Sequence, residues 1–337
     1  SETINHFSVN MLWGASAGVS GAEVGGLLNQ TNGHVNGFQG AGLANITTGK
    51  IIGAQAAGLL NTNSTGFLGA QMAGLMNVVS ASTGENESPI SSSTGTQASG
   101  LININGGDMN GFQAAGFLNV QGGEFEGVQV SGFANKSNDL KGVQAAGFIN
   151  IARNVSGVQI GLINISDTIG NGVPMGLFSF VKKGGYSAAE IESNESFYAN
   201  ANYKLGVQRF YTIFSLAFEE QNGKKFWAPG FGFGTYMPLG TKTGINIDGI
   251  SYNINENKWW TDELNQLNKL KISGSYQLAR RLNVYGGVSI NVLVTKLSDN
   301  EDDPNRRLFK TPDPWFDDVS GRTHVFIYPG FNAGLRF

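Results

Sequence analysis

A nine-residue pattern recurs through the N-terminal half of the chain, and it restricts the possible folds more than any other feature. The pattern is Gly-x-Gln-x-(Ala/Ser)-Gly-(Leu/Phe)-x-Asn, mostly at a spacing of 16 residues, and clear copies begin at Gly37, Gly53, Gly69, Gly95, Gly111, Gly127 and Gly142. Weaker copies begin at Gly21, Gly157 and Gly172. A fixed period of this kind indicates one structural unit that pairs with its own copies. The Ser/Thr-rich insertion at 80–93 has few apolar residues, so we expect a loop there.

Two architectures accommodate this repeat. In the first, each unit is one antiparallel membrane strand and a turn, with Gln55, Leu59 and Asn61 facing inward and Ala56 and Leu60 facing lipid. Ten such strands, one N-terminal strand and seven C-terminal strands give a barrel of about 16–18 strands. In the second, each unit is one coil of a parallel β-solenoid carried by an eight-stranded barrel, and Gln and Asn stack in ladders. The absence of Trp and Tyr from the repeats favours the second architecture.

A solenoid inserted between the first two strands of a small barrel would end far from where it begins. Its main strand would also have two apolar faces and no wet one. We therefore expect the first architecture, an all-β antiparallel transmembrane barrel, and keep the solenoid as the alternative. The corresponding regions are a first barrel strand in 1–20, the repeats in 21–186 and the C-terminal strands with long outer loops in 187–337.

The C-terminal region has the alternation of transmembrane β-strands. In 282–294 the residues Leu282, Val284, Val288, Ile290 and Val292 share one face, and mostly polar or small residues share the other. The segments 270–278, 197–205 and 6–13 alternate in the same way, as strands with a lipid face and an inner face do. Short connections alternate with longer polar ones, which is typical of a barrel with tight turns on one side and outer loops on the other.

The repeats, the junction 172–218 and the aromatic C-terminal strands together resemble the surface-repeat outer-membrane β-barrel proteins of Gram-negative bacteria. The chain stops on Phe337, and a last strand ending in an aromatic residue resembles the signal read by the barrel assembly machinery. The resemblance implies an integral outer-membrane protein, exported with a removed signal peptide and in contact with lipid and lipopolysaccharide. It implies location rather than activity.

Composition excludes several classes of function. The net charge of −3 offers no basic field for nucleic acid, and the chain has no cysteine for disulfides or thiolate metal sites. The histidines His6, His34 and His324 stand in unrelated contexts without metal-ligand spacing. No nucleophile elbow or zinc-protease motif is present. We therefore expect no enzyme activity and no cofactor.

Three groups of residues remain as candidate sites. The neutral amides of the repeats are expected to line the lumen: Gln39, Gln55, Gln71, Gln113, Gln129 and Gln144. Aromatic residues in the predicted outer loops are expected to contact protein partners: Trp259, Trp260, Trp315 and Phe316. An acidic loop is a weak calcium candidate, although a solvated loop is the simpler interpretation: Asp299, Glu301, Asp302 and Asp303.

Together these features predict a non-enzymatic outer-membrane surface protein, acting as a structural or interaction subunit of an outer-membrane complex. The alternative is a porin-like channel or a transporter of apolar substrates, since a barrel of about 16–18 strands can hold an aqueous lumen.

Overall fold

The computed structural model describes residues 4–80, 92–221, 223–261, 264–296, 311–321 and 323–337. The chain divides into two compact units, Ser1–Gly184 and Gly185–Phe337. This boundary lies close to the one expected at residue 186.

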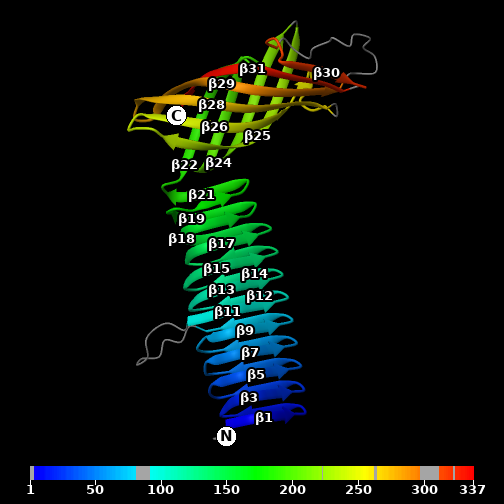
Figure 1. Ribbon diagram of the computed structural model, residues 1–337, viewed down its shortest axis with the longest axis vertical. Helices are drawn as coiled ribbons and strands as arrows, with labels where there is room; N and C mark the ends of the chain where they lie inside the picture. The colour runs from blue at the N-terminus through cyan, green and yellow to red at the C-terminus, as the bar shows by residue number, and fades with distance from the viewer. Residues whose placement is uncertain (1–3, 81–91, 222, 262–263, 297–310, 322) are drawn as a thin grey trace. The chain divides into compact units, whose positions relative to one another are not determined.

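The first unit is a parallel β-solenoid of about 11 turns. Each regular coil contains one long and one short strand, and like strands of successive coils pair in parallel (Figure 1). The long strands are β1 (Ile4–Asn10), β3 (Gly18–Gly25), β5 (Val35–Ala41), β7 (Ile51–Ala57), β9 (Phe67–Ala73), β11 (Ser92–Ser99), β13 (Asp108–Ala115), β15 (Glu124–Ser131) and β17 (Asp139–Ala146). The short strands are β2 (Trp13–Ser16), β4 (Leu28–Thr31), β6 (Ala44–Thr47), β8 (Leu60–Asn63), β10 (Met76–Val79), β12 (Ile102–Asn105), β14 (Leu118–Gln121) and β16 (Ala134–Lys136).

The last coils of the solenoid are less regular. Strand β18 (Ile149–Ile160) runs continuously from the short-strand position of one coil to the long-strand position of the next, because it pairs with both β16 and β17. Strands β19 (Ile163–Ile169), β20 (Val173–Met175) and β21 (Phe178–Lys183) complete the unit.

The parallel register places identical repeat positions on top of one another. Gln55 of β7 lies beside Gln39 of β5 and Gln71 of β9, and Asn61 of β8 lies beside Asn45 of β6. Stacked amides can donate and accept along the solenoid axis, which satisfies buried polar groups. One column of apolar side chains completes the interior: Val19, Val35, Ile51, Phe67, Met109, Phe125, Leu140 and Val155.

Two glycine columns explain why the repeat requires Gly at fixed positions. Gly53 has φ 127, and a Cβ there would lie 2.0 Å from the carbonyl oxygen of Gly37 in the coil below. Gly58 begins the turn between β7 and β8, and its Cβ would lie 2.1 Å from the oxygen of Gly42. Any side chain at either position would push adjacent coils apart.

The expected single barrel of about 16–18 strands is therefore wrong. A repeat unit is not one membrane strand, because the turn at Gly58-Leu59 divides it into the two strands β7 and β8. The chain reverses its direction at this turn. The segment expected to be the first barrel strand, in 1–20, instead forms the start of the solenoid, where β1 pairs in parallel with β3.

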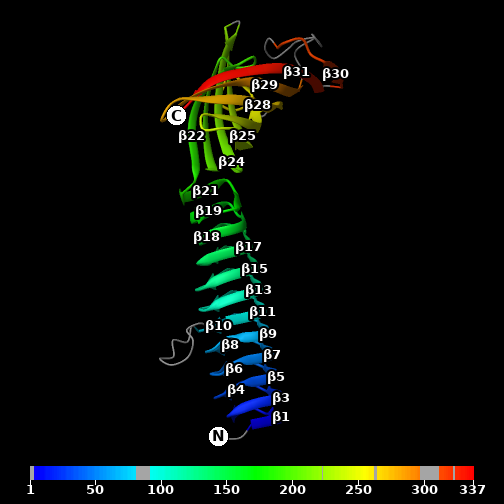
Figure 2. The ribbon, with the colours of Figure 1, turned by 60° about the vertical axis from the view of Figure 1, so that its left-hand side comes forward.

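The second unit is a closed antiparallel sheet. Eight strands pair in sequence, and the first pairs with the last through contacts such as Ile191 beside Leu335 (Figure 2). These strands are β22 (Tyr186–Asn194), β23 (Ala199–Val207), β24 (Phe210–Gln221), β25 (Lys224–Pro238), β26 (Thr243–Asn253), β28 (Asn265–Ala279), β29 (Leu282–Lys296) and β31 (Thr323–Arg336). The short β27 (Asn255–Glu256) pairs with β25, and β30 (Phe316–Ser320) pairs with β31. The strand pairing of the described residues agrees with the alternative in having a solenoid and an eight-stranded barrel, but all eight barrel strands follow the solenoid and none precedes it.

The alternation expected from the sequence correctly separates the inner face from the outer face in most of these strands. In β28 the lysines Lys269 and Lys271 are buried, whereas Leu270 and Ile272 between them are exposed. In β29 the side chains of Val288 and Ile290 are exposed and that of Asn291 is buried. The alternation was wrong at one strand start, where Phe197 is buried and Tyr198 is exposed.

Candidate functional site

The interior of the eight-stranded barrel holds a group of buried ion pairs. Lys204 of β23 lies 3.0 Å from Glu190 of β22 and 2.7 Å from Asp248 of β26. Arg336, next to the C-terminus, donates from Nε to Glu190 at 2.6 Å and from a terminal nitrogen to Asn246 at 2.8 Å. These groups come from four strands, β22, β23, β26 and β31, so closing the sheet brings them together.

Two further lysine–carboxylate pairs continue this interior. Lys271 donates to Glu192 at 2.7 Å, and Lys269 donates to Glu195 at 2.7 Å. The hydroxyl of Tyr285 donates to Glu192 at 3.0 Å. These side chains are almost completely buried, and a buried charge is tolerated only when it is paired and hydrogen-bonded in this way.

An aromatic and aliphatic layer fills the rest of the interior. It contains Phe197, Tyr211, Ile213, Ala217, Phe226, Ala228, Ile250, Tyr252, Ile254, Leu267, Leu293, Phe326 and Tyr328. An eight-stranded barrel is narrow enough for side chains to occupy its centre, and these ion pairs and rings do so. The interior is thus a packed, charged core.

The outer face of the same barrel is apolar. Its exposed side chains include Ile191, Tyr203, Phe233, Leu270, Ile272, Val288, Ile290, Phe331 and Leu335. A water-soluble domain buries its apolar residues and exposes its charges. This unit departs from that arrangement, because five lysine or arginine ion pairs lie inside it beside the aromatic layer, and aliphatic side chains cover its outside.

The aromatic residues predicted to contact partners are exposed. Trp259 and Trp260 lie between β27 and β28, and each is 62% exposed. Trp259 packs against Trp227 with the ring centroids 5.8 Å apart. Trp260 lines a groove of about 530 Å³ together with Phe231.

The other two predicted contacts lie at the edge of the sheet. Trp315 donates its backbone N–H to Ile327 at 2.7 Å, and Phe316 begins β30. The C-terminal Phe337 exchanges backbone hydrogen bonds with Ala189, so it helps to close the barrel. Its role as an assembly signal stays a prediction.

The glutamines predicted to line a lumen are not in the barrel. They lie in the interior of the solenoid and form one ladder, in which Gln55 donates to Gln39 at 2.9 Å and Gln71 donates to Gln55 at 2.9 Å. The same ladder includes Gln113, Gln129 and Gln144, together with Glu23 and Gln97. Each glutamine side chain is fully buried, so these residues hold the coils together rather than face a passage.

The sequence pattern assigned the Leu/Phe position of the repeat to the wrong side. Leu59 was expected to face inward with Gln55, but the turn at Gly58-Leu59 rotates it outward and leaves it 42% exposed. The corresponding side chains of successive coils form an exposed column, which we call the apolar ridge: Leu27, Leu43, Leu59, Leu75, Leu101, Phe117, Phe133, Phe148 and Leu162. Its phenylalanines stack, with centroids 4.9 Å apart for Phe117 and Phe133.

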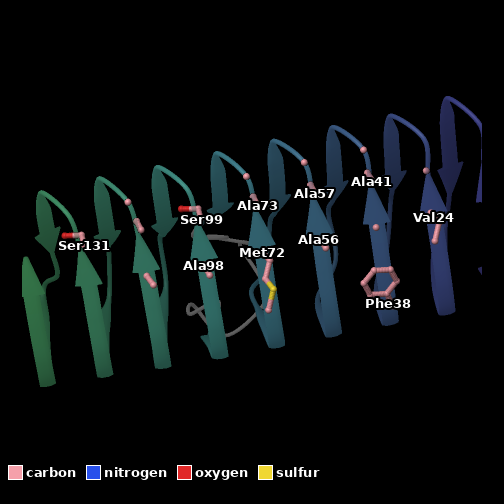
Figure 3. Close-up of a pocket in the computed structure, with 18 of the residues that line it drawn as sticks. Val24, Phe38, Ala41, Ala56, Ala57, Met72, Ala73, Ala98, Ser99 and Ser131 are labelled. Carbon is pink, nitrogen blue, oxygen red and sulfur yellow. The ribbon is translucent and has the colours of Figure 1, made fainter.

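A shallow groove of about 1070 Å³ runs beside the apolar ridge on the long-strand face. Small residues such as Ala56 and Ala98 form its floor, and the larger side chains of Phe38 and Met72 stand out from it (Figure 3). The groove and the ridge together make one apolar surface over many coils.

The opposite edge of the solenoid is polar, and in the coils from Glu124 onward it carries ion pairs. Arg153 forms two hydrogen bonds of 3.2 Å with Asp139 of the preceding coil, Lys182 lies 2.6 Å from Asp167, and Lys141 pairs with Glu124. The hydrogen bonds from Arg153 lower the pKa of the Asp139 carboxyl. The solenoid is therefore amphipathic in cross-section, with the apolar ridge at one edge and inter-coil ion pairs at the other.

The acidic loop with Asp299, Glu301, Asp302 and Asp303 lies outside the described residues. Within the part of the chain that the structure describes, no group of three or more His, Asp or Glu side chains could hold a metal ion. The described residues also contain no helix that is long and apolar enough to cross a membrane. No protein-family model, no curated protein and no solved structure matches this chain.

Proposed function

We propose that this chain is an integral outer-membrane protein whose C-terminal barrel is the membrane anchor, and that it acts as a non-enzymatic structural or interaction subunit. The combination of buried ion pairs and an exposed aliphatic surface carries this proposal. Exposed aliphatic residues such as Ile272 and Val288 favour hydrocarbon, whereas Lys271 and Glu192 are paired inside.

The closed sheet supports the same proposal through its backbone. In hydrocarbon every backbone N–H and C=O must be bonded internally, and a closed sheet has no free edge. Here β22 bonds to both β23 and β31, so the ring of strands is complete.

The apolar band can be tested with single cysteines, because the chain has none of its own. A bimane label on Ile272→Cys in proteoliposomes should be quenched by brominated lipid acyl chains. The matched control is Lys258→Cys, an exposed position in the connection between β27 and β28. Equal, weak quenching at both positions in folded protein would contradict the membrane anchor.

The alternative function, a transport channel, required the aqueous lumen of a barrel of about 16–18 strands, and that barrel does not form. Because ion pairs and aromatic rings occupy the interior of the eight-stranded barrel, we expect planar-bilayer recordings of the purified protein to show no regular conductance steps. Reproducible unitary steps would bring transport back as the function.

The interaction role draws on Trp259, Trp260 and Trp315, which are large, exposed and outside the regular barrel wall. Exposed aromatic residues of this kind are frequent at contact surfaces. Cross-linking of the protein in intact cells, followed by mass spectrometry, should recover neighbours linked to these loops. Recovery of the chain only as an isolated monomer would oppose the subunit role.

A further inference from the structure

The solenoid has an apolar edge that extends over many coils. Its ridge is Leu or Phe in every coil from Leu27 to Leu162, each side chain being 38–49% exposed. Exposed apolar surfaces on soluble monomers are normally limited to a few hundred square ångströms, and longer continuous ones mark a contact with a membrane or another molecule. We therefore expect the apolar ridge to be covered by a membrane or by another molecule.

The backbone N–H groups of this edge are already hydrogen-bonded without water. The N–H of Gly58 donates to Ala41, and the N–H groups of Leu59 and Leu60 both donate to Leu43 in the coil below. The same three bonds recur at Gly74, Leu75 and Met76, and again at 116–118 and 132–134. An ordinary turn leaves such N–H groups to water, whereas these are bonded to the neighbouring coil, which lowers the cost of burying this edge in hydrocarbon.

Charge is segregated from the ridge in the described coils. The inter-coil ion pairs lie at the opposite edge, as Arg153–Asp139 and Lys182–Asp167 show. A structure with one apolar side and one charged side is suited to the boundary between hydrocarbon and water.

The surface beside the ridge lacks a repeated shape. At one position of the long strand the side chain is Val24, Gly40, Ala56, Met72 or Ala98 in successive coils (Figure 3). A rigid protein partner needs a complementary surface for each of these sizes, whereas fluid acyl chains adapt to all of them. At this position apolarity is retained although size is not, and Ser99 and Ser131 are the polar residues that line the groove beside it, which favours lipid.

We propose that the apolar ridge and the adjoining groove bind the acyl chains of a lipid bilayer, so that the solenoid lies against the membrane by its Leu/Phe edge. This inference rests on the proposed function, because the barrel joined to the solenoid at Gly184 and Gly185 is what holds it near the bilayer. The charged edge, which includes Asp139 and Arg153, then faces water.

The test uses the full chain in proteoliposomes, with one bimane-labelled cysteine in each variant. Leu43→Cys places the label on the ridge, and Thr48→Cys places it at the polar edge of the same coil. We expect brominated phosphatidylcholine to quench the ridge label at least about twofold more than the polar-edge label. Leu59→Cys repeats the measurement one coil further along.

The barrel label on Ile272→Cys separates this inference from the proposed function. Quenching at Ile272 without quenching at Leu43 would overturn the lipid contact and leave the membrane anchor in place. Absence of quenching at both positions would remove the anchor and the inference together. If pyrene on Leu43→Cys forms excimers while bromolipid does not reach it, the ridge is covered by a second copy of the chain and the inference is wrong.

Discussion

Glycine at two positions of each coil sets the spacing of the solenoid. Ala at Gly53 would combine a φ of 127 with a Cβ 2.0 Å from a backbone oxygen that cannot rotate away. We expect Gly53→Ala to lower the free energy of unfolding of the solenoid by more than about 1 kcal/mol. Urea unfolding followed by circular dichroism measures this change. Gly170→Ala is the matched control, because its Cβ would meet nothing closer than 3.7 Å, and an equal loss there would refute the steric explanation.

Asp139, at the polar edge, makes a pH-dependent contribution to the stability of the solenoid. Its hydrogen bonds with Arg153 lower the pKa of the carboxyl below the ordinary value of 3.8. A carboxyl whose pKa is lower in the folded state than in the unfolded state stabilises the folded state at pH values above its unfolded-state pKa. This stabilisation is lost as the pH falls through the pKa that the carboxyl has in the folded state. The stability difference between wild type and Asp139→Asn should therefore be present at neutral pH and shrink below about pH 3.8. Unfolding curves over this range decide it, and a difference that does not change with pH would contradict it.

At the scale of the element, the amide ladders replace much of an ordinary apolar core. Asn61 accepts from Asn45 at 2.9 Å and donates to Asn77 at 2.9 Å and to the backbone of Met72 at 2.6 Å. Each coil thus depends on the side chains directly above and below it. This dependence makes the solenoid cooperative along its axis.

Removing one amide should leave its neighbours unsatisfied. We expect Asn61→Ala to lower the free energy of unfolding by about 1–3 kcal/mol, because it orphans buried amide groups of Asn45 and Asn77. The double substitution Asn61→Ala/Asn77→Ala should cost less than the sum of the two single changes, since the shared bond is lost once. A double-mutant cycle in urea measures this coupling. Strict additivity would mean that the ladder bonds contribute little.

The turn inside each repeat could not be predicted from the alternation of its residues. Ile51, Gln55, Asn61 and Asn63 are all odd-numbered and all buried, so a single strand through the repeat explains them with uninterrupted alternation. The turn at Gly58-Leu59 reverses the chain between two of these residues and turns Leu59 outward. Period-two alternation cannot detect a turn that preserves the parity of the buried positions. The glycine that precedes Leu or Phe in the repeat, Gly58 in this copy, was the available sign of the turn. A glycine there is compatible with a close approach of two backbones as well as with a small side chain on the inner face of a strand.

At the scale of the whole molecule, the barrel depends on bringing charges from distant strands together. Lys271 and Glu192 are 79 residues apart in sequence and 2.7 Å apart in space. Breaking such a buried pair leaves an uncompensated charge, so Lys271→Met should destabilise the folded barrel by about 3–5 kcal/mol. Urea titration in detergent, read by the heat-modifiable mobility of the barrel on gels, measures this loss.

The paired substitution provides the control for this prediction. Lys271→Met/Glu192→Gln should recover most of the lost stability, because it removes both charges rather than one. Asp167→Asn, which breaks the exposed pair with Lys182, should have little effect. A single Lys271→Met variant as stable as wild type would show that the buried charges do not hold the barrel closed.

The sequence by itself determined the all-β composition, the presence and spacing of the repeat, and the inner and outer faces of strands such as β28 and β29. These properties follow from local periodicity, because side chains alternate along a strand wherever it pairs. The tertiary structure decided the rest: that the repeats stack in parallel, that Leu59 lies outside, and that Arg336 meets Glu190 in a closed sheet. Parallel stacking and antiparallel pairing satisfy the same backbone groups, so only the packing of one coil on the next distinguishes them.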